Sequence, residues 1–149
     1  MVKSSTMETL ISLATDEVEK AAVALGHAIR AGAEAEQRLT LLLQYREDYV
    51  VRFQENRKTG LSAMDYQNYH NFIDKLDEAI SGQQKIVQQA QERIDGAKAV
   101  WQECERKRAS YETLQKRAEV RKMKKELKQE QKEADEFNSR KARMAKLKR

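Results

Sequence analysis

Apolar and small residues recur at alternating spacings of four and three along the first third of the chain. The series consists of Met7, Ile11, Ala14, Val18, Ala21, Leu25, Ala28, Gly32, Ala35, Leu39, Leu42, Arg46, Tyr49, Phe53 and Asn56. Only Arg46 and Asn56 are neither apolar nor small. A strict repeat of this length predicts a left-handed coiled coil rather than a helix of a globular domain. Because Ala and Gly fill its first half, we expect a partner helix to approach closely there.

A second series with the same spacing follows a short interruption. It consists of Tyr66, Tyr69, Ile73, Leu76, Ile80, Gln83, Val87, Ala90, Ile94, Ala97, Trp101, Cys104, Arg108 and Tyr111. Gln83 and Arg108 are its polar members, and the pattern weakens through Gln115, Ala118 and Lys122. A second helix of similar length is therefore predicted, with an apolar stripe that matches the first.

Residues 58–62 separate the two series. Gly60 suits the left-handed conformation that follows a helix end, and Ser62 with Asp65 fits a capping box at the start of the next helix. A short connection between long helices implies antiparallel neighbours. The predicted fold class is all-α: a long antiparallel two-helix coiled-coil hairpin with its turn near Lys58–Ser62.

The domain prediction is one elongated hairpin over residues 1–149. Helix 1 is expected over 5–58, from a capping box at Ser5 and Glu8, and helix 2 over 62–118. Residues 119–149 hold twelve Lys or Arg and six Asp or Glu, a net charge of +6 within a total of +5. They are expected to form a basic extension that is helical or partly disordered. Such an extension favours an acidic surface, nucleic acid or lipid head groups.

Composition excludes several classes of protein. Charged residues make up 36% of the chain and proline is absent, which is typical of long helices and not of a sheet-containing domain. No apolar run is long enough to span a membrane, and no signal peptide is evident at the first residues. A single cysteine excludes an internal disulfide. We therefore expect a cytoplasmic protein.

One group of residues is richer in aromatic rings than a two-helix seam requires. If positions whose numbers add to 121 oppose each other, the pairs are 38 with 83, 42 with 79, 45 with 76 and 49 with 72. The group then forms one patch that consists of Arg38, Leu42, Tyr45, Tyr49, Phe72, Leu76, Ala79 and Gln83. A half-exposed aromatic pair, Tyr45 and Phe72, beside apolar neighbours predicts a partner site. The alternative interpretation is a widened hairpin core.

No catalytic constellation is present in the sequence, so we predict neither enzymatic activity nor a metal or other cofactor. His27 and His70 lie far apart and are expected to face solvent. Cys104 is expected to act as a small buried hydrophobe, and Trp101 to pack in the seam. Arg46 and Arg108, both at seam positions, are expected to extend outward and help fix the pairing of the helices.

Several blocks in sequence carry a family resemblance. They are residues 7–10, 44–49, 68–73, 76–80 and 135–144, Met-Glu-Thr-Leu through Asp-Glu-Phe-Asn-Ser-Arg-Lys-Ala-Arg-Met. Taken in this order and spacing, they resemble the FliJ family, small soluble components of the bacterial flagellar type III export apparatus. The resemblance covers essentially the whole chain.

The resemblance implies a hairpin like the rotor-stalk subunit of rotary ATP synthases. Its ends, residues 7–35 and roughly 95–149, would enter the ring of the hexameric export ATPase FliI and promote its assembly and activity. The residues expected to contact the ring are Leu10, Leu13, Val18, Leu25, Trp101, Tyr111, Leu114 and Phe137. The eight-residue patch around Tyr45 would bind the export gate protein FlhA.

Other implied partners are the ATPase regulator FliH and export chaperones similar to FlgN and FliT. The implied location is the cytoplasmic face of the inner membrane at the flagellar base, where the protein would associate peripherally with the membrane by binding the gate. No nucleic-acid partner is implied. Two alternatives stay open at this point. A nucleic-acid-binding helical protein would explain the basic extension, and a generic coiled-coil adaptor or oligomer would explain the heptads.

Overall fold

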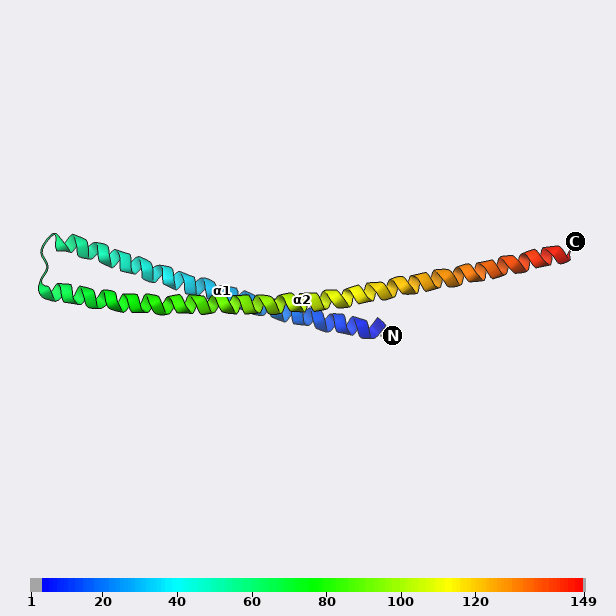
Figure 1. Ribbon diagram of the computed structural model, residues 1–149, viewed down its shortest axis with the longest axis horizontal. Helices are drawn as coiled ribbons and strands as arrows, with labels where there is room; N and C mark the ends of the chain where they lie inside the picture. Colours follow the sequence, from blue (N-terminus) through cyan, green and yellow to red (C-terminus); the bar gives the residue numbers. More distant parts are fainter. Residues whose placement is uncertain (1–3, 149) are drawn as a thin grey trace. The chain divides into compact units, whose positions relative to one another are not determined.

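The computed structural model describes residues 4–148 and forms two helices. Helix α1 spans Ser4–Arg57 and helix α2 spans Ala63–Leu147. The helices form an antiparallel hairpin with extensive contacts between them, which confirms the predicted all-α class. The chain divides into a middle unit, Glu17–Cys104, and a terminal unit, whose described residues are 4–16 and 105–148. Figure 1 shows α1 and α2 side by side through the middle unit.

The connection between the helices follows the predicted turn chemistry. The backbone amide of Lys58 donates to the Glu55 carbonyl at 3.2 Å, and Gly60 adopts a φ of 92°, in the left-handed region that favours glycine. Ser62 and Asp65 form the predicted capping box. The Asp65 amide donates to Ser62 Oγ, and the Ser62 amide donates to Asp65 Oδ2, both at 3.2 Å.

The start of α1 differs slightly from the prediction. The helix begins at Ser4, so Ser5 lies within its first turn rather than before it. No hydrogen bond joins Ser5 and Glu8 among the described residues; instead, the Ser5 carbonyl accepts from Thr9 Oγ1 at 3.0 Å. Because Ser5 lies inside the helix, its side chain is not at the flanking position from which a residue caps the helix start.

The seam of the middle unit consists of the residues that the heptads predicted. Its buried apolar residues are Val18, Ala21, Ala35, Ile73, Leu76 and Ile80. The predicted close approach occurs at Gly32, where an added Cβ would lie 2.8 Å from Ile94 Cδ1. Each larger side chain removed from water here stabilises the pair by roughly 1.5–3 kcal/mol.

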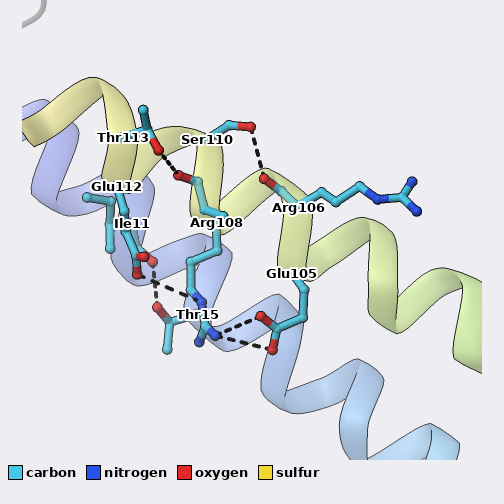
Figure 2. A network of polar contacts seen from close by, with 9 residues as sticks. Ile11, Thr15, Glu105, Arg106, Arg108, Ser110, Glu112 and Thr113 are labelled. Atoms are coloured by element: carbon cyan, nitrogen blue, oxygen red, sulfur yellow. Dashed lines mark hydrogen bonds and ion pairs between the residues drawn. The ribbon is translucent and has the colours of Figure 1, made fainter. Parts of the chain in front are cut away.

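The terminal unit contains the start of α1, up to Asp16, and the part of α2 from Glu105 onward. Ala14 is its buried residue, with 2% of its surface exposed. Arg108 of α2 donates from Nη2 to both carboxylate oxygens of Glu105, at 3.0 and 3.2 Å, and its Nε lies 3.9 Å from Glu112. Figure 2 shows these residues with Ile11 and Thr15 of α1 in the same view. Arg108 thus finds its partners on its own helix.

Helix α2 continues past the expected end near residue 118. It runs to Leu147, and every described residue from Lys116 onward is exposed. No proline or glycine follows Gly96 to stop the helix. Lys, Glu, Gln, Arg and Ala dominate the segment and favour helix, with polar pairs such as Gln129 Nε2 to Glu133 Oε1 at 3.4 Å.

Candidate functional site

Six aromatic rings gather in the middle unit near the connection between the helices. We call them the aromatic cluster: Tyr45, Tyr49 and Phe53 of α1 with Tyr66, Tyr69 and Phe72 of α2. The chain has nine aromatic residues of the Phe, Tyr and Trp types, so two thirds of them lie here. The rings join the two helices by direct side-chain contact.

The inner rings of the cluster stack face to face. Phe53 and Tyr69 have centroids 3.6 Å apart at 13°, and Tyr49 and Tyr69 lie 5.5 Å apart at 8°. Tyr66 meets Phe53 edge-on at 5.3 Å. Tyr69 is therefore the ring that connects Tyr49 with Phe53. Aromatic pairs of this kind contribute about 0.5–1.5 kcal/mol each beyond their buried area.

The outer end of the cluster is open to solvent. Phe72 lies 4.4 Å from Tyr49 and 6.0 Å from Tyr45, the latter edge-on at 70°. Tyr45 keeps 53% of its surface exposed, and Phe72 is half-buried. About half of the Tyr45 surface is consequently accessible to a partner, while the ring of Phe72 packs against it.

Some residues of the predicted patch are exposed to solvent, and others are half-buried or buried between the helices. Arg38, Tyr45 and Ala79 are exposed, whereas Leu42, Tyr49, Phe72 and Gln83 are half-buried and Leu76 is only 7% exposed. Of the predicted opposed pairs, the structure shows Tyr49 against Phe72. Tyr45 contacts Phe72, and the Gln83 amide crosses to donate to the Ala35 carbonyl at 2.9 Å.

A cross-helix ion pair lies beside the cluster. Arg46 Nε donates to Asp77 Oδ1 at 2.6 Å. The hydrogen bond to Asp77, and then its charge, raise the pKa of Arg46 above its ordinary value. Arg46 does lean out of the seam as predicted, but its partner Asp77 was missed, since nothing in the heptad pattern marks that position.

Sequence reasoning also missed the extent of the cluster. It treated Phe53, Tyr66 and Tyr69 only as seam residues, although their spacing of three and four from the patch aromatics already placed them on the same stripe. His70 and His27 are exposed, as predicted. The ring of His70 lies 5.4 Å from Tyr69.

Two further seam predictions concern Trp101 and Cys104. Trp101 is half-buried. Cys104 is half-buried as well, rather than fully buried, because the seam is a single stripe on each helix and solvent reaches its edges.

The residues expected to contact an ATPase ring fall into both units. In the terminal unit, Leu13, Leu114 and Phe137 are 56%, 45% and 65% exposed, whereas Leu10 and Tyr111 are half-buried. In the middle unit, Leu25 and Trp101 are half-buried and Val18 is buried in the seam. Their binding role stays a prediction.

Other kinds of site find little support. No group of His, Cys, Asp or Glu among residues 4–148 could hold a metal ion. A shallow hollow lined by polar residues between Lys128 and Arg143 draws all its walls from one exposed helix. No helix in the described part of the chain contains a stretch long and apolar enough to cross a membrane.

Comparison with known proteins gives a consistent result over nearly the whole length. A family model described as "Flagellar FliJ protein" matches residues 3–146. Two relatives carry the name Flagellar FliJ protein, one from Escherichia coli (strain K12) and one from Salmonella typhi. Each is 31% identical over 142 residues, which cover 95% of this chain and 97% of the relative.

Proposed function

Since this chain belongs to the flagellar FliJ protein family, we propose that it links two parts of the flagellar export apparatus. The family is a non-catalytic component of that apparatus, in agreement with the predicted lack of enzymatic activity. In the proposal, the middle unit binds the export gate protein FlhA. The terminal unit acts as a stalk for the hexameric export ATPase FliI and promotes its assembly and activity.

The exposed ring of Tyr45, backed by Phe72, is the observation that carries the gate contact. Positions flanking a two-helix seam are usually charged, because they are half in water. Here an aromatic ring stands in that place with 53% of its surface exposed and is held by the ring behind it. An aromatic side chain that is fixed before binding is well suited to anchor a partner, since little side-chain freedom is lost on contact.

The exposed apolar residues of the terminal unit support the ring contact. Leu13, Leu114 and Phe137 present large apolar side chains to solvent, and the helix beyond them is rich in Lys and Arg. Burying these side chains against a ring would stabilise the assembled ATPase by mass action. We place the protein at the cytoplasmic face of the flagellar base, with the regulator FliH and export chaperones similar to FlgN and FliT as further partners.

A double substitution, Tyr45→Ala with Phe72→Ala, tests the gate contact. Binding to purified FlhA should be lost, whereas stimulation of ATP hydrolysis by FliI should be retained. The matched control is Leu41→Ala, which removes a 62% exposed side chain from α1 outside the patch. Unchanged FlhA binding by the double variant would refute the gate assignment. Loss of both activities would show that these rings only maintain the hairpin.

A further inference from the structure

An unpartnered apolar stripe runs along the exposed part of α2. It consists of Val120, Met123, Leu127, Ala134, Phe137 and Met144, which follow heptad spacing. All are exposed, and the five larger side chains keep 50–66% of their surface in solvent. The stripe begins two residues after Ala118 and so lies out of phase with the seam at Gln115, Ala118 and Lys122. It is a second apolar stripe, not an extension of the hairpin seam.

Two charged residues interrupt this stripe at heptad positions of their own. Glu130 occupies a d position and Lys141 an a position, with Val120 taken as a. Neither side chain forms an ion pair or hydrogen bond with another described residue. Charges in an apolar seam lower its stability but select the alignment that pairs them. A partner helix should therefore place a cation opposite Glu130 and an anion opposite Lys141.

A second copy of the same segment places opposite charges against Glu130 and Lys141 in one of the two orientations. Parallel pairing would set Glu130 against Glu130 and Lys141 against Lys141, which is repulsive. Antiparallel pairing about a two-fold axis between residues 135 and 136 sets Glu130 of each copy opposite Lys141 of the other. We propose that residues 123–148 of two chains pair in this antiparallel alignment and form a homodimer.

The neighbouring positions suit the same alignment. Leu127 lies opposite Met144 of the second copy, and Ala134 opposite Phe137 of the second copy, so that a large side chain meets a small one. On one flank Glu133 meets Arg140 of the second copy, and on the other Gln131 meets Asn138 of the second copy. Each pair occurs twice by symmetry. The charges along this face are thus complementary to themselves when one copy is reversed.

Antiparallel alignments shifted by one heptad suit the stripe less well. A shift in one direction sets Glu130 opposite Ala134 and Lys141 opposite Met123. A shift in the other direction pairs Glu130 with Lys148 but sets Lys141 opposite Phe137. Both shifts leave Lys141 opposite a large apolar side chain, whereas the unshifted alignment pairs it with Glu130. This dimer goes beyond the function proposed above and does not depend on it. The two share one residue, Phe137, so self-pairing and binding to an ATPase ring compete for one face of the helix.

A charge-exchange experiment on the full-length protein tests the dimer. Sedimentation equilibrium of the wild-type chain should give a mass that rises with concentration from monomer to dimer. Glu130→Lys alone places like charges opposite each other twice, and Lys141→Glu alone does the same. Each should weaken self-association at least about tenfold. An equimolar mixture of the two variants should dimerise again, because positions 130 and 141 then carry opposite charges across the mixed pair.

The matched controls make the same charge changes on the opposite face of the helix. Glu136→Lys and Lys132→Glu should dimerise like the wild type, since neither residue faces the second copy. A wild-type chain that stays monomeric at every concentration would overturn the proposal and leave the stripe to a different partner. A dimer whose strength is unaffected by Glu130→Lys would overturn the alignment. So would a mixture of the two variants that stays monomeric.

Discussion

Replacing Tyr69 with alanine removes the ring that connects Tyr49 with Phe53 in the aromatic cluster. Tyr69 stacks on Phe53 at 3.6 Å and on Tyr49 at 5.5 Å, and both contacts cross from α2 to α1. Each stacked pair contributes about 1 kcal/mol beyond burial. The half-buried ring adds about 1–2 kcal/mol from area removed from water. We therefore expect Tyr69→Ala to lower the free energy of unfolding by about 3 kcal/mol.

Urea unfolding followed by circular dichroism at the helical minimum measures this change. With a denaturant slope of about 2 kcal/mol per molar urea, the midpoint should fall by about 1.5 M. Tyr69→Phe is the control, since it keeps the ring and removes a hydroxyl for which the described residues provide no hydrogen-bond partner. Its midpoint should stay within about 0.3 M of the wild type. If Tyr69→Ala were as stable as Tyr69→Phe, the cluster would not join the helices energetically.

In two pairs of variants, the same substitution at two different positions should have different effects on stability. Gly60→Ala should destabilise the protein by about 1 kcal/mol, because φ is 92° there. Gly82→Ala should stabilise it by about 1 kcal/mol, because Gly82 is helical with open space around it. Thermal unfolding of both variants would check the opposite signs. In urea, Leu76→Ala, at a site 7% exposed, should cost about 2–4 kcal/mol, and Leu41→Ala, at a site 62% exposed, less than about 0.5 kcal/mol.

The seam could be predicted position by position because a two-helix pairing follows a single periodic rule. Of the fifteen residues in the first heptad series, only Asn56 is exposed, and it lies in the last turn of α1. Gly60 and the Ser62–Asp65 capping box were also predictable, since their conformations depend on a few neighbouring residues.

The polar contacts between the helices could not be predicted in the same way. The Arg46–Asp77 ion pair and the hydrogen bond from Gln83 to the Ala35 carbonyl depend on the axial offset of the two helices and on side-chain rotamers. Heptad letters fix which face is buried but not that offset. Residues 119–149 were expected to be helical or partly disordered because the apolar stripe fades after Ala118; helix-forming residues continue, and α2 runs to Leu147.

The most direct test of the proposed linker is ATP hydrolysis by purified FliI, measured with the full-length chain and with a chain that ends at Ala118. The shortened chain retains every buried described residue, because all described positions from Lys116 onward are exposed. We predict that the full-length protein stimulates hydrolysis and that the shortened chain loses most of this effect. Equal stimulation by both chains would exclude a role for the basic helix at the ring. An absence of stimulation by either chain would contradict the stalk function itself.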